Sequence, residues 1–296
     1  TGLAPDWTST ATSAWASRNI FVDNIVSAIS GCLFLLLGLA CGAAINWLAG
    51  SVTEEGGIRL RPPACAKCST RRRAEHLIPL AGYFMARGRC PNCAEAIPLR
   101  VPVLEAATGI LFLALYLKYG LYWSLAVLLV YSIVLIILFV TDFEHFMLPN
   151  IVVYPSLLLA ALVALAVTLG RYSLPWSLYF GGSGFMAVFN NFLLCSLAGG
   201  MCGALLLLLV VVLSRGGMGM GDVSLAGLLG LMLGFPLVFV ALFLSILAGG
   251  MVAAVLLISG RKKRKEMLPF GPFLCLGGMV TLLWGKELLG WYLSLV

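Results

Sequence analysis

Long apolar stretches, separated by short polar segments, run through most of this chain. A helix needs about 20 apolar residues to cross a bilayer, and seven stretches are candidates for such a helix. A shorter apolar stretch covers about 223–235. The alternating segments of membrane β-barrels are absent, so the pattern predicts a helical bundle. The seven longer stretches lie at about 22–49, 101–117, 121–141, 151–169, 188–213, 236–259 and 270–292.

The composition agrees with a membrane protein. Of the 296 residues, 61% are hydrophobic and only 10% are charged. A soluble domain of this size could not bury so much apolar surface, so a lipid bilayer is the expected solvent. We therefore predict an all-α polytopic membrane protein.

The positions of the basic residues predict its orientation. Fifteen of the nineteen lysines and arginines lie within 59–100, at Arg215 or in the RKKRK run at 261–265. Because positive charge is enriched in cytoplasmic loops, we expect these segments on the inside and the N-terminus outside. This arrangement counts the 223–235 stretch as a crossing, which gives a bundle of about eight transmembrane helices. Apolar stretches flank the RKKRK run closely, so we interpret it as a helix anchor and expect no nucleic-acid partner.

This topology divides the chain into an external N-terminal tail at 1–21, a first transmembrane helix at 22–49, a cytoplasmic loop at 50–100 and a transmembrane bundle at 101–296. The loop contains two CxxC pairs separated by 21 residues. Such pairs in a reducing compartment are typical of a structural zinc site with four thiolate ligands. Reduced structural thiols are the alternative. The predicted ligands are Cys65, Cys68, Cys90 and Cys93; the five other cysteines lie in apolar stretches and are interpreted as packing residues.

Acidic residues at the edges of apolar stretches are costly and need an explanation. Glu105, Asp142, Glu144 and Asp222 occupy such positions. With the predicted topology, Asp142 and Asp222 lie on the same side of the membrane. Two carboxylates brought together from separate helices can share a proton and perform general acid–base catalysis. The alternative is that each aspartate pairs with a nearby basic side chain and anchors a helix end.

Glycines precede one of these aspartates in the sequence GGMGMGD. Without side chains, Gly219 and Gly221 would let an extended substrate approach the backbone beside Asp222, and a turn there could adopt positive φ. We therefore predict that both glycines contribute to substrate binding. The same position in the chain places Asp222 at the N-terminal start of a helix and Asp142 at the C-terminal end of another. The helix dipole then favours Asp222 as the ionised base and Asp142 as the protonated partner.

Several segments in order make the chain resemble the bacterial type IV prepilin peptidases, a family of GxGD aspartic proteases. The resemblance begins near residue 38, covers nearly all of the remaining chain and includes the paired CxxC loop. The segments that carry it are GLACGAAIN, IPLAGYFMARGRC, IPLRVPVLEAATG, TDFEHFMLPN, MGMGDVSLAGLLG and LPFGPFL.

The resemblance implies an enzyme of the bacterial inner membrane that serves type IV pilus or type II secretion systems. Its substrates would be single-span prepilins or pseudopilins, cut on the cytoplasmic side after a short basic leader. Asp142 and Asp222 match the catalytic aspartates of the family. The cysteine-bearing members also methylate the new N-terminus with S-adenosylmethionine, so the resemblance implies this second activity as well. Because the leader and the loop are both basic, we expect Glu144, two residues after Asp142, to help bind the leader.

Two other functions are weighed against this one. Presenilin- and signal-peptide-peptidase-like intramembrane proteases share the GxGD pattern, but they have a Pro-Ala-Leu motif near the last span where this chain has LPFGPFL. A transporter or zinc-bearing scaffold could use its acidic residues as a proton relay. Cleavage of a leader-bearing substrate by the purified protein separates the peptidase from both transporter and scaffold.

Overall fold

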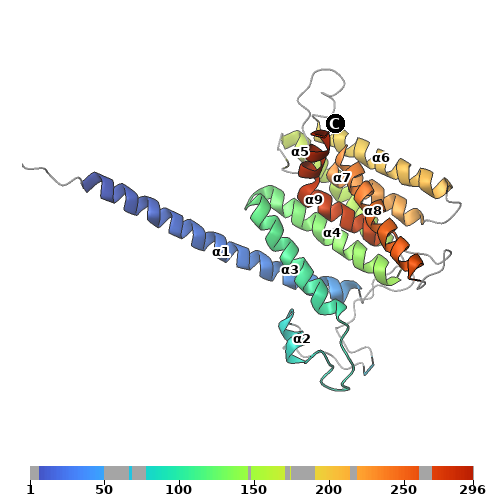
Figure 1. The fold of residues 1–296 in the computed structure, drawn as a ribbon, viewed down its shortest axis with the longest axis horizontal. Coiled ribbons are helices and arrows are strands. Elements are labelled where there is room, and N and C mark those ends of the chain that lie inside the picture. The colour runs from blue at the N-terminus through green and yellow to red at the C-terminus, as the bar shows by residue number, and fades with distance from the viewer. Residues whose placement is uncertain are drawn as a thin grey trace, which may run out of the picture. The chain divides into compact units, whose positions relative to one another are not determined.

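The computed structural model describes residues 7–49, 67–68, 78–145, 148–170, 174, 191–213, 219–259 and 269–295. Within these residues it is helical, with a single isolated bridge between Arg89 and Ala96 and no β-strand. The order of the helices can be followed in Figure 1. They are α1 (Trp7–Ala49), α2 (Ala81–Met85), α3 (Arg100–Tyr119), α4 (Trp123–His145), α5 (Asn150–Gly170), α6 (Phe192–Leu213), α7 (Met220–Leu233), α8 (Leu237–Ile258) and α9 (Gly271–Leu293).

The prediction of an all-α polytopic membrane protein is confirmed. Seven helices of the described chain are long and apolar enough to cross a membrane, counting the part of α1 from Ile25 to Ala49. Most of the 223–235 stretch lies in α7, which has only 14 residues. At 1.5 Å per residue α7 is about 21 Å long, shorter than the bilayer core of about 30 Å. The described residues therefore contain seven full-length candidate spans and one short apolar helix.

The helix α4 continues past the end of its apolar stretch. It ends at His145, whereas the apolar run ends at residue 141. The extension includes Asp142, which lies on the packed face of the helix and is 5% exposed. A polar residue thus ended the hydrophobic pattern without ending the helix.

The chain forms two compact units. The first comprises Thr1–Ala44 and Cys65–Gly120, and the second comprises Ile45–Ala64 and Leu121–Val296. In the first unit, α3 packs closely against α1, because a Cβ added at Gly38 would stand only 2.7 Å from the Gly109 Cα atom. The same unit contains the cysteine-bearing segment.

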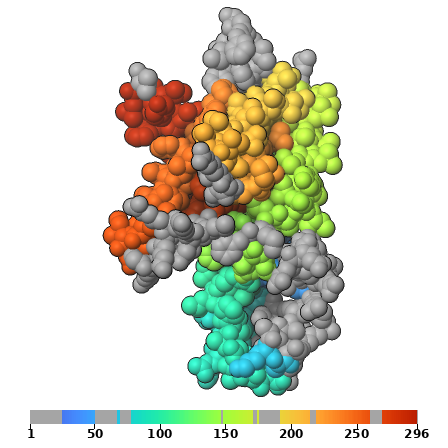
Figure 2. Space-filling model, turned by 90° about the vertical axis from the view of Figure 1, so that its right-hand side faces the viewer, coloured from blue at the N-terminus to red at the C-terminus, as the bar shows by residue number. Residues whose placement is uncertain are grey.

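In the second unit α7 is the most enclosed helix and packs against α5, α6, α8 and α9. Its contact with α6 is close because a Cβ at Gly203 would lie 2.8 Å from the Ala226 carbonyl oxygen. All residues of α7 from Leu225 to Gly230 are buried, as expected for a helix that is apolar all round. On the face shown in Figure 2, α5 and α6 lie side by side and carry apolar side chains outward.

The helix α9 packs against both α4 and α7. Gly271, Cys275 and Gly278 lie at positions i, i+4 and i+7, which fall on one helix face. A Cβ at Gly278 would be 3.5 Å from Leu135 of α4 and 3.6 Å from the Cγ atom of Leu229 of α7. These small residues let α4 and α7 approach the same face of α9.

Candidate active site

Asp142 lies in the last turn of α4 and is almost fully buried. The start of α9 meets it there. The Gly271 backbone N–H interacts favourably with the carboxylate, although Oδ2 makes no complete hydrogen bond to any described residue. A Cβ at Gly271 would stand 2.9 Å from the Asp142 Cγ atom. The absence of a side chain at Gly271 is therefore what makes room for this carboxyl group.

Asp222 lies in the first turn of α7, three residues after the N-cap Gly219, and is 8% exposed. Its carboxylate interacts with the Gly219 backbone N–H. A carboxylate at this position satisfies a backbone donor that the start of a helix leaves without a partner. The predicted location at a helix N-terminus is thus observed, and the adjacent backbone favours a negative charge there.

The two aspartates, 80 positions apart in the chain, come together beside α9. Asp142 lies close enough to Asp222 for a direct electrostatic interaction. Cys275, fully buried one turn after Gly271, lies near both carboxylates. The segments around the aspartates also touch, because a Cβ at Gly221 would meet Leu148 at 3.1 Å. The structure therefore joins two motifs that the sequence could only assign to the same side of the membrane.

The alternative role of helix-end anchors receives no support from the described residues. No ion pair joins Asp142 or Asp222 to a basic side chain among the described residues. An uncompensated pair of buried carboxylates is costly. Two such groups side by side are the arrangement in which one proton is shared.

The glycines before Asp222 differ in their surroundings. Among the described residues, the nearest atom to a Cβ added at Gly219 is 3.9 Å away and belongs to the same turn. Gly221 instead packs against Leu148, which gives it a packing reason to lack a side chain. Neither residue has positive φ: Gly219 is extended, with φ of −80° and ψ of 149°, and Gly221 lies within α7. The expectation of a positive-φ turn was therefore wrong for these two residues.

The structure also shows where Glu144 and Cys275 lie relative to the aspartates. Glu144 is half-buried and lies about 200° around α4 from Asp142, so the two side chains leave the helix on different sides. Cys275, interpreted from the sequence as a packing residue, is buried as expected but also borders the aspartate pair. No sequence pattern signals that position, because it depends on how α9 packs between α4 and α7.

The fourth acidic residue, Glu105, has a different role in the first unit. It lies on α3, is 6% exposed, and accepts a hydrogen bond of 2.7 Å from the Leu80 backbone N–H. Leu80 has φ of 56°, in the left-handed region that costs energy for a residue with a side chain. The buried carboxylate thus holds the start of α2 on α3, a contact between residues 25 positions apart that the sequence did not predict.

Three of the four predicted zinc ligands converge in the first unit. The Sγ atoms of Cys68, Cys90 and Cys93 all lie within 4.8 Å of one another, and those of Cys68 and Cys90 are 3.9 Å apart. Cys65 lies outside the described residues. A tetrahedral zinc with bonds of about 2.3 Å requires sulfur atoms about 3.8 Å apart. The described thiols therefore fit a zinc ion, and no disulfide joins the cysteines in the described part of the chain.

The backbone of the second CxxC pair is folded into a tight turn. The Ala94 N–H donates to the Cys90 carbonyl, the Cys90 N–H donates to the Glu95 carbonyl, and the Ile97 N–H donates to the Gly88 carbonyl. Gly88 has φ of 65°, which suits glycine. These bonds bring both thiols of the pair to the same side as Cys68. The Lys67–Glu95 ion pair links the segments at the surface, where such a pair contributes little.

Two family profiles match two different segments of the chain. The profile of the bacterial peptidase A24 N-terminal domain matches residues 36–119, and the profile of the type IV leader peptidase family matches residues 129–254. The first match covers the cysteine-bearing segment and α3. The second covers α5, α6, α7 and most of α4 and α8, and so contains both aspartates.

Several curated proteins named prepilin leader peptidase/N-methyltransferase are similar over most of the chain. The Bacillus subtilis protein is 27% identical over 78% of this chain and 85% of its own length. The Pseudomonas aeruginosa protein is 29% identical over 78% of this chain and 74% of its own length. The Pseudomonas putida protein is 30% identical over 80% of this chain and 77% of its own length. No solved structure matches. The chain therefore belongs to the type IV leader peptidase family and is an enzyme.

Proposed function

We propose that this protein is a membrane aspartic endopeptidase that removes the basic leader from type IV prepilins or pseudopilins. The observation that carries the proposal is the convergence of Asp142 and Asp222. These two buried carboxylates lie close enough to interact electrostatically, and Gly271 at the start of α9 leaves room beside Asp142. The names of the relatives support prepilins as the substrate class. The distribution of basic residues supports cleavage on the cytoplasmic side of a bacterial inner membrane, with the N-terminus outside.

In this mechanism the aspartate pair holds one proton and orients one water molecule. The ionised carboxylate takes a proton from the water as its oxygen attacks the scissile carbonyl carbon. The protonated carboxyl group hydrogen-bonds the carbonyl oxygen and stabilises the charge that develops there. The amide C–N bond then breaks as the leaving nitrogen receives a proton from the pair, which returns to its starting state with one shared proton.

The positions of the aspartates on their helices support different roles for them. Asp222 has the Gly219 N–H and the positive end of the α7 dipole beside it, so it is the ionised base. Asp142 lies at the negative end of the α4 dipole and is the protonated partner. Infrared spectra of Asp142→Asn and Asp222→Asn test this assignment. A protonated-carboxyl band that survives in Asp142→Asn and vanishes in Asp222→Asn would reverse the two roles.

The principal test is cleavage of a candidate prepilin by the purified protein in detergent. Asp142→Asn and Asp222→Asn should each lower kcat by about 10²–10⁴-fold, the contribution of a positioned acid or base. Glu287→Gln is the matched control, because it neutralises an exposed carboxylate 16 positions after Gly271 on α9. Full cleavage by either aspartate variant would exclude the aspartic mechanism.

Substrate binding is proposed to involve Gly219, Gly221 and Glu144. Gly219 leaves backbone without a side chain at the N-cap of α7, three residues before Asp222, while Gly221 keeps the turn packed on Leu148 and so shapes the same surface. Glu144 attracts the basic leader, and its effect should be largest at low salt, where surface charges are least screened. Glu144→Gln should therefore raise KM for basic leaders at low ionic strength. The same KM for leaders of different charge would remove Glu144 from the binding site.

The second proposed activity is methylation of the new N-terminus with S-adenosylmethionine, in line with the names of the relatives. A methyl donor supplies the methyl group that the freed amine takes up. A structural zinc ion held by Cys65, Cys68, Cys90 and Cys93 would fix the loop of the first unit, and the sulfur spacing of the three described thiols supports it. Cleavage and methyl transfer measured on the same preparation test whether both activities belong to this chain.

A further inference from the structure

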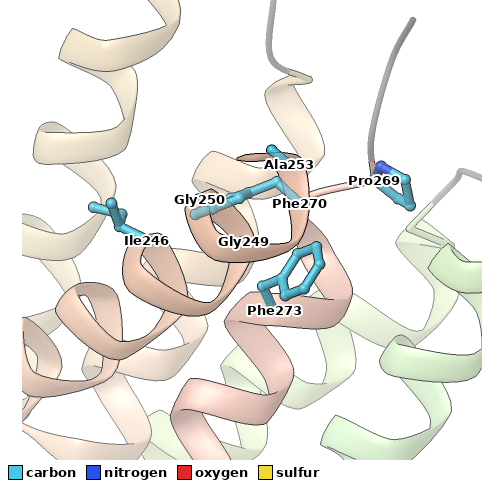
Figure 3. A pocket seen from close by; sticks show the side chains of 7 residues that line it. All are labelled: Ile246, Gly249, Gly250, Ala253, Pro269, Phe270 and Phe273. Carbon is cyan, nitrogen blue, oxygen red and sulfur yellow. The ribbon is translucent and has the colours of Figure 1, made fainter. Parts of the chain in front are cut away.

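An open apolar pocket of about 290 Å³ lies in the second unit, between α8 and the start of α9. Figure 3 shows Ile246, Gly249, Gly250 and Ala253 on α8, with Phe270 and Phe273 from the α9 side facing them. Pro269 completes the lining. None of these residues has a charged or hydrogen-bonding side chain, so the pocket offers contact only to an apolar group.

The glycines of α8 create this pocket. A Cβ at Gly249 would lie 3.4 Å from the rings of Phe270 and Phe273, so a side chain there would press against them. A Cβ at Gly250 would have no atom of the described residues within 4 Å. Within the described part of the chain, no side chain covers the helix surface at Gly250, and the Phe270 and Phe273 rings lie beside it.

One short segment lies between the pocket and the aspartate site. Phe270 lines the pocket, and the next residue, Gly271, lies against the Asp142 carboxyl group. The Phe270 carbonyl accepts hydrogen bonds from the Phe273 and Leu274 N–H groups, which fixes this segment as the first turn of α9. One face of the segment thus borders the candidate catalytic carboxylate, and the other borders an apolar pocket.

We propose that this pocket binds an apolar side chain of the substrate's membrane-spanning segment, close to the bond that is cut. The proposal rests on the function proposed above and adds a subsite to it. The basic leader is excluded as the occupant, because burying a lysine or arginine among apolar groups without a partner is costly. The volume lies just below the 300–1,000 Å³ of small-molecule sites, which suits one large side chain. A lipid acyl chain has the same apolar chemistry. The pocket lies next to the segment that contacts Asp142, however, and the substrate must bring its scissile bond to Asp142, which favours a substrate residue as the occupant.

The test fills the pocket without disturbing the fold. Gly250→Leu adds a side chain where an added Cβ meets no described residue. Gly290→Leu is the matched control, because Gly290 is also an exposed helical glycine whose added Cβ would have no described atom within 4 Å. Each variant is assayed in nanodiscs of one lipid composition against two single-span substrates. These carry either phenylalanine or alanine at the first apolar position after the scissile bond.

Gly250→Leu should raise KM for the phenylalanine substrate about tenfold, as expected when burial of a large apolar side chain is lost. The alanine substrate should change by less than about twofold, and Gly250→Ala should give a smaller shift in the same direction. Unchanged KM for both substrates, or a change that follows the lipid acyl chains and not the substrate residue, would overturn the proposal. If neither the wild-type protein nor Gly290→Leu cleaves either substrate, the proposed peptidase function itself fails.

Discussion

Gly271 of α9 lies directly against Asp142 of α4, so that a methyl group at this glycine would stand 2.9 Å from the Cγ atom of the carboxyl group. Gly271→Ala should therefore displace the carboxyl group from its position beside Asp222. We expect cleavage to fall at least about tenfold, since small displacements of reacting groups are costly, with a small change in melting temperature. Cleavage kinetics and thermal unfolding measure the two effects, and Gly290→Ala serves as control. Normal cleavage by a folded Gly271→Ala protein would contradict this role.

The packing of α6 on α7 predicts a difference between two neighbouring glycines. A Cβ at Gly230 would overlap the Gly199 backbone, whereas a Cβ at Gly227 would meet the Ala204 Cβ atom at an ordinary 3.6 Å. Gly230→Ala should lower the free energy of unfolding by about 1–3 kcal/mol. Gly227→Ala should be neutral or stabilise by up to about 1 kcal/mol, because alanine is the better helix former. Thermal or denaturant unfolding in detergent compares them, and equal destabilisation by both would show that the α6–α7 contact is looser than described.

The Glu105–Leu80 hydrogen bond predicts how the cysteine-bearing segment is held on α3. Glu105→Leu should leave the Leu80 N–H group without its acceptor and cost about 1–3 kcal/mol, while Glu105→Gln keeps an acceptor oxygen. Limited proteolysis within residues 78–97 should therefore be faster for Glu105→Leu than for Glu105→Gln or the wild-type protein. Identical cleavage patterns would mean that other contacts hold the segment.

Zinc binding can be tested separately from catalysis. Protein purified under reducing conditions should contain one zinc per chain, with sulfur neighbours at about 2.3 Å in X-ray absorption. Cys90→Ser or Cys93→Ser should lose the metal and destabilise the loop, whereas Cys32→Ser, an exposed cysteine on α1, should not. We expect methyl transfer to suffer more than cleavage, because the aspartates belong to the other compact unit. Equal loss of both activities in well-folded variants would contradict this division.

The amino-acid sequence by itself determined the membrane class, the helices and the candidate chemistry. Each long apolar stretch became a helix because a chain in lipid must satisfy its backbone hydrogen bonds internally. The cost of placing a carboxylate near lipid selected four acidic residues, and the predicted topology put Asp142 and Asp222 on the same side. The fixed spacing of the CxxC pairs selected their thiols. These signals are local, since they depend on residue type and on short separations along the chain.

The tertiary structure decided which of these residues meet. The small residues Gly271, Cys275 and Gly278 bring α4 and α7 to one face of α9, and Glu105 reaches the backbone of Leu80. The pocket beside Gly250 exists only because α8 packs against the first turn of α9. Hydrophobicity could not predict these contacts, because in a bilayer nearly every helix face is apolar. Close packing between particular small residues selects the partners instead.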